Sequence, residues 1–451
     1  MTSGIKYEKM RSSLRGQKKI LSVKYDCTGL EISFERILRN REDGNGMRAY
    51  ERLLNYVVIH TTSDESSETV PSTERQFDLA HKLRDEMAGL GIEDANVDAN
   101  CYVMGHIPAT PGCEDRPAIG FIAHLDTAPD SSGENVHPIV HKDYSGEDVE
   151  LGNGRMLTKA LFPHLSGLKG RTLITTDGST LLGADDKAGI AEIITMAEEI
   201  IRSDVPHGRI CIAFTPDEEI GHGAELLDLE KFGADFAYTV DGGPENEIEY
   251  ENFNAAKAVF DIRGVSVHPG DAKNRMVNAA LVACEISGML PSAETPAHTE
   301  GREGFYHLTD INGNVENAVI SYIIRDHDAG LFDAKIGTLR KIEKTINEKY
   351  GDGTVVLTVT DQYRNMIEKI RPHMHIVDTA KKCISMQRLE VLDVPVRGGT
   401  DGAQLSYRGL PCPNLGTGGY AFHGPLEHIT AEGMDTVVNI LCQIVKEYAK
   451  Q

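Results

Sequence analysis

Hydrophobic and polar positions along the chain follow the patterns of strands and helices in turn. Apolar runs of strand length occupy residues 119–123, 210–214 and 236–240, and residues 188–201 form an Ala- and Ile-rich segment of helical length. Apolar side chains also recur every three or four positions within residues 47–60 and 77–90, which is typical of helices. Because strands that alternate with helices form a sheet covered on both faces, the pattern predicts an α/β domain with a mixed sheet.

The pattern changes near Asn252. Strands and helices are mixed from there to about residue 360: the expected strands are 257–262, 318–324 and 354–360, and the expected helices are 276–290 and 331–350. The α/β pattern resumes at Met366 and ends with a helix over residues 432–448. This order predicts a smaller α+β unit inserted into the α/β domain.

The length of 451 residues is too great for one ordinary core, so more than one domain is expected. The boundaries predicted from the pattern are a poorly ordered N-terminal extension (1–46), the first part of the main domain (47–252), the inserted α+β domain (253–364) and the second part of the main domain (365–451).

Composition narrows the possible partners. The formal net charge is −23, which argues against nucleic acid and anionic membranes as partners. No apolar run reaches transmembrane length, and the first 46 residues lack the apolar core of a signal peptide. The eight cysteines are scattered without a CxxC pair, which disfavours a cysteine zinc site and favours a reducing compartment such as the cytoplasm.

Three expected strands are followed directly by acidic residues or histidine. Asp217, Glu218 and Glu219 come just after residues 210–214, and Asp241 with two glycines comes after residues 236–240. His124 and Asp126 come after residues 119–123, in the segment H-x-D-T. Alternate residues of a strand point the same way, so Asp126 could orient the His124 imidazole. Ligands collect at the carboxyl ends of strands in open α/β sheets, so these side chains are expected to meet there.

Two further segments bring the same chemistry. Asp185 and Asp186 stand in Gly183-Ala-Asp-Asp-Lys before an expected helix, where capping explains one aspartate but not two. His423 lies in a glycine-rich loop. Two histidines with several carboxylates suit two zinc ions that share one bridging carboxylate.

The order of these motifs resembles that of a family of two-zinc exopeptidases and deacylases. The order is H-x-D-T, G-A-D-D-K-A-G, D-E-E-x-G, V-D-G-G and a late histidine, and the resemblance runs from about Met47 to the C-terminus. Within the family, the chain is most similar to tripeptide aminopeptidases, in the segments 175–178, 182–192, 214–219, 251–256, 322–326 and 397–405. The first 46 residues have no counterpart in that family.

The resemblance implies a cofactor of two Zn²⁺ ions per subunit. His124, Asp185 and Asp241 would hold one ion. Asp185, Glu219 and His423 would hold the other, so that Asp185 bridges the two.

The resemblance also implies roles for residues that bind no metal. Asp126 would orient the neighbouring histidine, and Glu218 would be the general base that activates a metal-bridging water. His268, in the inserted domain, would donate a hydrogen bond to the oxyanion. Arg325 and Arg397 would bind the substrate's C-terminal carboxylate, and their fixed distance from the zinc ions would select tripeptides.

The function that the resemblance implies is a zinc-dependent aminopeptidase of peptide catabolism, which releases the N-terminal residue from tripeptides. The main domain would be catalytic, and the inserted domain would be a lid that also supports a homodimer. Two alternatives remain open. One is an N-acyl amino acid amidohydrolase of the same fold, and the other is a non-catalytic zinc-binding assembly protein.

Overall fold

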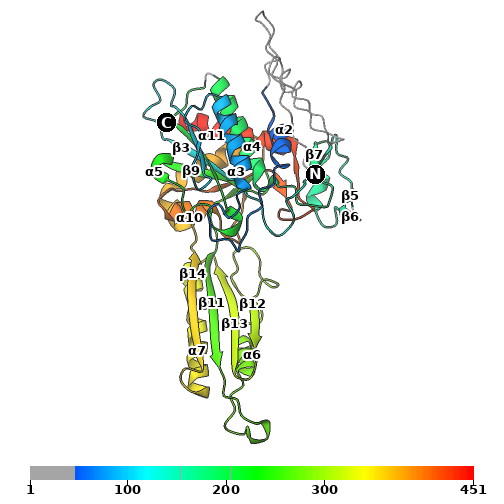
Figure 1. The fold of residues 1–451 in the computed structure, drawn as a ribbon. Helices are drawn as coiled ribbons and strands as arrows, with labels where there is room; N and C mark the ends of the chain where they lie inside the picture. The colour runs from blue at the N-terminus through cyan, green and yellow to red at the C-terminus, as the bar shows by residue number, and fades with distance from the viewer. Residues whose placement is uncertain (1–45, 153, 204, 451) are drawn as a thin grey trace, which may run out of the picture. The chain divides into compact units, whose positions relative to one another are not determined.

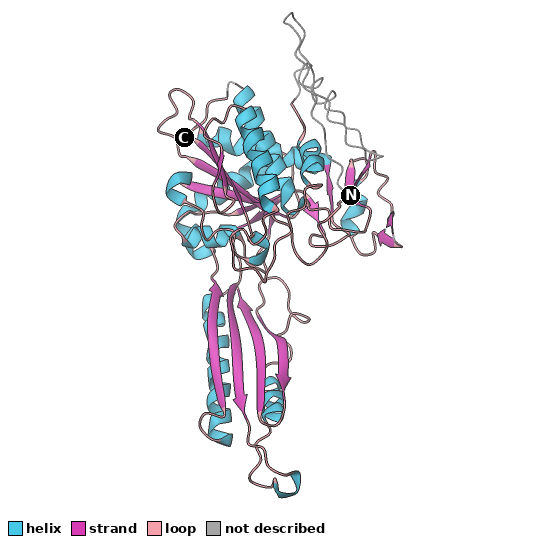
Figure 2. Cartoon of the chain, in the orientation of Figure 1, coloured by secondary structure: helices cyan, strands magenta, loops and turns pink. Residues whose placement is uncertain are grey.

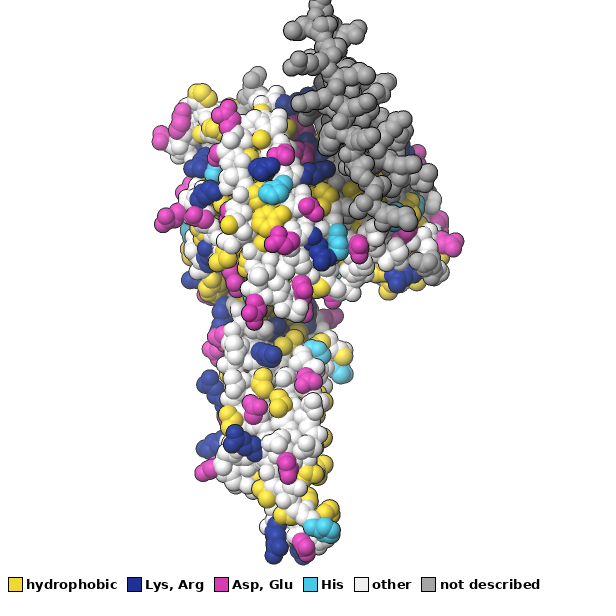
Figure 3. All heavy atoms as spheres, in the orientation of Figure 1, with side chains coloured by type: hydrophobic (Ala, Val, Ile, Leu, Met, Phe, Trp, Pro, Cys, Tyr) yellow, Lys and Arg dark blue, Asp and Glu magenta, His cyan; other side chains and the backbone are white. Residues whose placement is uncertain are grey.

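The fold was analysed in a computed structural model, which describes residues 46–152, 154–203 and 205–450. The expected N-terminal extension, apart from its last residue, lies outside the described residues. Among the described helices, none is long and apolar enough to cross a membrane. On the face drawn in Figure 3, the described Lys and Arg side chains are scattered among acidic ones.

The main domain is built on a mixed eight-stranded sheet (Figure 1). The strands, in spatial order, are β1 (Asn96–Val97), β2 (Val103–Ile107), β8 (Ile210–Thr215), β3 (Ile119–His124), β9 (Phe236–Gly242), β16 (Asn414–Gly416), β10 (Glu247–Glu249) and β15 (Leu392–Asp393). The central strands β8, β3, β9 and β16 are mutually parallel, whereas β2 and β10 run antiparallel to their inner neighbours. The expected mixed-sheet fold class is therefore confirmed.

Helices cover both faces of this sheet (Figure 2). One face carries α4 (Ala184–Arg202), against which α2 (Ala49–Tyr56) and α11 (Ala431–Tyr448) pack, with α9 (Met374–Met386) beside α11. The other face carries α5 (Leu229–Phe232) and α10 (Asp401–Tyr407), whose Phe232 and Leu405 join a core cluster with Ile122 and Ala213. The helix α3 (Gln76–Gly89) packs beside β2. Burial on both faces explains the continuous apolar runs of the central strands.

A smaller antiparallel sheet has no counterpart among the expected elements. Its order is β17 (Gly419–Tyr420), β18 (His428–Thr430), β7 (Leu173–Thr176) and β4 (Pro138–His141), and a hairpin of β5 (Val149–Gly152) and β6 (Arg155–Leu157) lies nearby in sequence. The loop that carries His423 runs between β17 and β18. This sheet therefore fixes both ends of that loop.

A separate α+β unit consists of a four-stranded antiparallel sheet and two helices. Its order is β12 (Phe305–Gly313), β13 (Asn317–Asp326), β11 (Asn254–Arg263) and β14 (Val355–Tyr363), and its helices are α6 (Ala279–Gly288) and α7 (Ala329–Tyr350). It has a hydrophobic core of its own, which includes Phe260, Ile320, Phe332 and Leu339. This α+β unit, together with the mixed sheet, matches the fold class expected from the sequence.

Candidate metal centre

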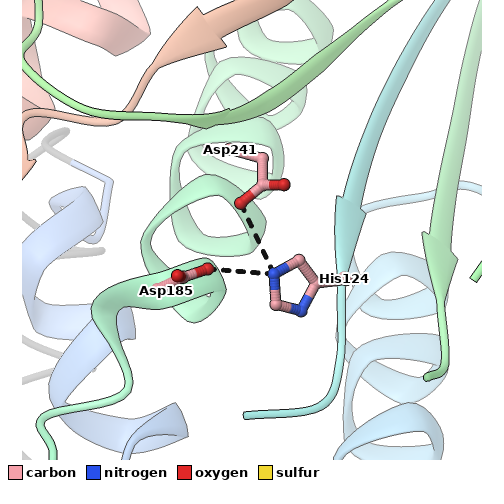
Figure 4. Close-up of side chains that lie close together, drawn as sticks. All are labelled: His124, Asp185 and Asp241. Atoms are coloured by element: carbon pink, nitrogen blue, oxygen red, sulfur yellow. Dashed lines mark hydrogen bonds and ion pairs between the residues drawn. The ribbon is translucent and has the colours of Figure 1, made fainter. Parts of the chain in front are cut away.

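The first candidate ligand set joins two strand ends to a helix start. His124 is the last residue of β3, Asp241 lies near the end of β9, and Asp185 lies in the first turn of α4. Figure 4 shows the three side chains pointing toward one another. The His124 Nε2 atom is 2.9 Å from Asp185 Oδ1 and 3.4 Å from Asp241 Oδ1. His124 and both aspartates thus present one atom each to a common point.

The second candidate ligand set shares Asp185 with the first. His423 Nε2 lies 3.0 Å from Glu219 Oε2 and 3.3 Å from Asp185 Oδ2. Asp185 therefore directs one carboxylate oxygen toward His124 and the other toward His423. A carboxylate placed in this way can bridge two cations.

The residues present fit two divalent metal ions. Within each set, the donor atoms all lie within 4.8 Å of one another. Tetrahedral zinc with nitrogen and oxygen ligands separates its donors by about 3.3 Å, close to the distances found here. The Oε1 atom of Glu219 is buried and has no hydrogen-bond partner among the described residues, a state that a bound cation would relieve. The donor set of imidazoles and carboxylates therefore suits two ions such as zinc.

Local backbone geometry explains how Asp185 reaches this position. The helix α4 begins four residues earlier than the expected 188, and Asp185 and Asp186 depart from helical φ/ψ within its first turn. Gly183 precedes it with φ of 76°, a left-handed conformation that glycine adopts without strain. The Asp186 carboxylate accepts hydrogen bonds from the backbone N–H of His124 and Gly189. The second aspartate of the motif thus ties α4 to the end of β3.

Asp126 holds the ends of two strands together. Its carboxylate lies 3.4 Å from His124 Nδ1, and it accepts the backbone N–H groups of Glu218 at 3.0 Å and Glu219 at 3.2 Å. Asp126 is fully buried. The Asp126 carboxylate thus holds the imidazole of His124, from the first ligand set, and the main chain of Glu219, from the second.

Glu218 lies in the same cavity but belongs to neither ligand set. The cavity has a volume of about 680 Å³, and Asp185, Glu218, Glu219, Asp241 and His423 all line it. Burial and then repulsion from Asp241 raise the pKa of the Glu218 carboxyl well above its usual range. Glu218 is thus placed beside the ligands with the capacity to hold a proton.

The pKa values are raised for His423, His124 and Glu219, so in the metal-free protein these residues hold protons at the positions where cations would bind. Hydrogen bonds to Asp185 and Glu219 raise the pKa of His423 to about 11. Burial opposes a charge on His124, but the negative charge of Asp241 and the hydrogen bonds that His124 donates to Asp126 and Asp185 raise its pKa overall. Burial and the neighbouring Asp185 raise the pKa of Glu219 to about 8. Carboxylates crowded in this way need cations to remain ionised together.

Asp217 turns away from the cavity. Its backbone adopts φ of 57°, unusual for a residue other than glycine, and its carboxylate accepts the Ser72 N–H at 2.7 Å and the Gln76 Nε2 at 2.6 Å. Gln76 therefore anchors Asp217, since it also accepts the Asp217 backbone N–H at 3.2 Å. These contacts give Asp217 a role in supporting the turn that carries Glu218 and Glu219.

Sequence reasoning missed Glu427. This residue is 1% exposed, and its carboxylate accepts the backbone N–H groups of Leu182, Gly183 and Asp185 at 2.7, 2.8 and 3.0 Å. It holds the loop that delivers Asp185. No local pattern marks it, because its partners are main-chain groups more than 240 residues away.

The structure does not bring His268 to this cluster. His268 is exposed and follows β11 in the chain. The first residues of β11 lie beside the cavity, because Ala255 pairs with Tyr363, which lines it. The strand then runs eight residues further to Arg263, or about 26 Å at 3.3 Å per residue. His268 lies beyond that far end.

Arg325 and Arg397 lie near the cavity and have partners within the protein. Arg325 Nη1 donates to the backbone oxygens of Ala256 and Ile324 and to Gln362, which lines the cavity. Arg397 donates to the backbone oxygens of residues 299, 301 and 303. Arg397 follows Val396, another lining residue.

Comparisons with known proteins agree with this geometry. The model of peptidase family M20/M25/M40 matches residues 177–447. A protein named peptidase T from Alkaliphilus oremlandii is 51% identical over 404 residues, which cover 89% of this chain and 99% of that protein. Another protein named peptidase T, from Clostridium perfringens strain 13, is 50% identical over 405 residues, covering 90% and 100%.

Solved structures show the same fold. The aminopeptidase PepT from Bacillus cereus superposes with a TM-score of 0.71 at 23% identity, covering 90% of this chain and all of that one. A tripeptidase from Staphylococcus aureus gives 0.69 at 22% identity, with the same coverage. A Bacillus subtilis protein described as a dinuclear metal-binding peptidase of the M20 family gives 0.61 at 15% identity, covering 89% and 99%.

The fold, the paired ligand sets and the family match define a hydrolase, and the chain belongs to peptidase family M20/M25/M40. Its group within that family is the one whose members are named peptidase T.

Proposed function

We propose that the protein is a zinc-dependent aminopeptidase that releases the N-terminal residue from tripeptides. The observation that carries this proposal is the pair of ligand sets that share Asp185, with Glu218 beside them in one cavity. The names of the relatives, peptidase T and a tripeptidase, support the substrate class.

The mechanism assigns separate tasks to neighbouring side chains. His124, Asp185, Asp241, Glu219 and His423 would hold two zinc ions, which would supply polarisation of the scissile carbonyl and a lower pKa for the attacking water. Glu218 takes the proton of the attacking water and delivers it to the leaving amine. Asp126 fixes the Glu218 main chain and orients His124, so that base and ligand keep their relative positions.

Arg325 and Arg397 take the substrate's C-terminal carboxylate in this proposal. Arg325 contacts Gln362 at 3.0 Å and lies 5.2 Å from the centre of the Tyr363 ring, and both neighbours line the cavity. A guanidinium at a fixed distance from the metal ions would favour one peptide length. Arg325→Met is expected to raise KM for a tripeptide more than for its C-terminal amide.

His268 and the homodimer are joined in the proposal, because the far end of β11 carries His268 away from its own cavity. A second copy that pairs through the inserted domain would supply His268 to the oxyanion. Mixing a His268→Ala variant with a Glu218→Gln variant tests this. Activity that reappears in the mixture supports the shared site, and a mixture no more active than its parts contradicts it.

The reaction is tested with a peptide panel at matched concentrations. Trialanine should be cleaved faster than dialanine and tetraalanine, with alanine released from the N-terminus. Equal rates on all three peptides would refute tripeptide selectivity, and faster release from an N-acyl amino acid would favour a deacylase. Metal analysis after dialysis should find two zinc ions per chain. Neither bound metal nor activity on any substrate would favour the assembly protein.

A cytoplasmic location completes the proposal. The seven cysteines among the described residues carry free thiols, and six of them are buried. Thiols in this state suit a reducing compartment.

A further inference from the structure

Two buried carboxylates line the cavity without belonging to either ligand set. Glu247 and Glu249 stand on β10 and are 7% and 8% exposed. Residues two apart in a strand point the same way, and both side chains line the cavity together with Glu218 and Asp241. The metal ligation and the proposed base chemistry leave this pair without a task.

The pair is fixed in place from β16, the strand between β10 and the strand that carries Asp241. Asn414 Nδ2 donates to Glu249 at 2.6 Å, while Asn414 Oδ1 accepts the backbone N–H of Asp241 at 3.1 Å. Glu247 accepts hydrogen bonds from the backbone N–H of Gly243 and from the Glu249 carboxyl, so the pair shares one proton. Glu247 and Glu249 therefore keep a set distance from the metal ligands.

The cavity has more negative charge than two metal ions can balance. Its described lining holds six carboxylates, those of Asp185, Glu218, Glu219, Asp241, Glu247 and Glu249, and no Lys or Arg. Because Glu247 and Glu249 share one proton, these groups carry five negative charges, and two divalent cations balance four of them. The remaining excess lies at the Glu247–Glu249 end, so that end favours a cationic group of the substrate.

A neighbouring cavity of about 470 Å³ adjoins the first and carries no excess of negative charge. It shares Gly221, Gln362, Tyr363 and Gln404 with the first cavity. Two arginines, Arg364 and Arg408, and two acids, Glu225 and Asp361, line the rest of it. Gly221 follows β8, whereas the acidic pair lies on β10, four strands away across the sheet. The acidic pair therefore lies on the side of the first cavity away from this neighbour.

The strand spacing places the metal centre between the two ends. Glu249 lies two strands beyond Asp241, which corresponds to about 10 Å at 4.8 Å per strand. A peptide whose amino terminus lies at the acidic pair would extend across the strand ends from β10 toward β9. Its first peptide bond would then face the metal ligands.

We propose that Glu247 and Glu249 bind the α-ammonium group of the substrate and so determine that the enzyme removes N-terminal residues. The inference rests on the proposed function. A substrate without the ammonium group leaves a buried carboxylate pair without its cation, and sites that lose a buried polar partner discriminate strongly.

The test compares two substrates that differ only in this group. Trialanine carries the ammonium, and N-propionyl-Ala-Ala is the same molecule without its amino group. The wild type should prefer trialanine by at least about 100-fold in kcat/KM. Glu249→Gln and Glu247→Gln should each lower kcat/KM for trialanine by about 10- to 100-fold and leave the propionyl substrate within about twofold.

Controls separate recognition from damage. Glu230→Gln, on the exposed surface of α5, should behave as the wild type with both substrates. Zinc content and thermal unfolding should match the wild type in at least one of the two pocket variants, and Glu247→Gln leaves the Asn414 contact in place.

The outcomes distinguish this inference from the proposed function. Equal losses on both substrates in the pocket variants, with wild-type trialanine cleavage intact, would overturn the inference alone. A wild type that cleaves N-propionyl-Ala-Ala better than trialanine would overturn both. Selective loss on trialanine supports ammonium recognition.

Discussion

Glu218 is the residue on which the proposed chemistry depends most directly. Its carboxyl group lines the cavity, belongs to neither ligand set and has a pKa that burial and Asp241 raise. Glu218→Gln keeps the shape and removes the base, so kcat should fall by about 100- to 10,000-fold. Zinc content should stay at two per chain. Substantial activity in a variant with both ions bound would remove the base assignment, and Glu230→Gln serves as the matched control.

Glu427 offers a second test at this scale. A glutamine there has one acceptor oxygen for three backbone N–H groups and adds donors that face them. Glu427→Gln should weaken zinc binding by about 10- to 100-fold, because it loosens the loop that delivers Asp185. A competition titration with a chelating dye measures the change. The exposed Glu368→Gln on α8 (Ile367–Ile370) is the control, and equal affinities in the two variants would refute the role.

Residues of the site were predictable from the sequence where an acid or a histidine follows an apolar run or lies in a glycine-rich turn. His124, Asp185, Glu219, Asp241 and His423 each follow a strand or a glycine-rich turn, and the structure places them in two sets. Glu427, by contrast, acts through backbone groups distant in sequence, and Glu247 and Glu249 matter through a cavity that no local spacing reveals.

The close approach of α4 to β9 is the element-scale feature that holds the centre. A Cβ added to Gly189 would stand 1.9 Å from the Val240 backbone oxygen, next to Asp241. Gly189→Ala should therefore push α4 from the sheet, lower the free energy of unfolding by about 2 kcal/mol or more and weaken zinc binding.

The matched control for Gly189 is Gly337, an interior residue of α7 where an added Cβ meets nothing within 4 Å. Gly337→Ala should raise the free energy of unfolding by up to about 1 kcal/mol through helix propensity. Chemical denaturation of both variants measures the contrast. Similar effects at the two positions would contradict the packing argument.

Long periodic elements were predictable, and short ones were not. The expected strands at 119–123 and 210–214 differ by one residue from β3 and β8, and the helix 331–350 differs by two residues from α7. The strands β4 to β7 and β17 to β18 have two to four residues each, too few for a pattern to show. Their pairing depends on contacts such as that of His428 with Thr175, far apart in the chain.

At the scale of the whole molecule, the metal centre joins distant parts of the chain. Its ligands come from the ends of β3 and β9, the start of α4, the short helix Glu218–Ile220 and the loop before β18. No part of the domain can hold the ligand sets without the others. Metal binding should therefore stabilise the main domain as a unit, and the gain in stability should depend on pH.

The pH dependence follows from carboxyls whose pKa values are raised in the folded, metal-free protein. Burial raises the pKa of Asp401 to about 7 and of Glu427 to about 7, and burial raises that of Asp241 to about 6. The unfolded chain loses these protons near pH 4, so between pH 5 and 7 the folded form binds more protons, and its stability falls as pH rises. Bound zinc replaces the protons at its ligands, so the stability of the zinc-loaded protein should fall less between pH 5 and pH 7. The difference in Tm between zinc-loaded and chelator-treated protein should therefore widen from pH 5 to pH 7 by about 3 °C or more. Scanning calorimetry at both pH values measures it.

The Glu427→Gln variant lacks one of the titrating groups, so its metal-free form should lose less stability over the same interval. A Tm difference that stays constant or narrows toward pH 7 would contradict the coupling between the buried carboxyls and metal binding.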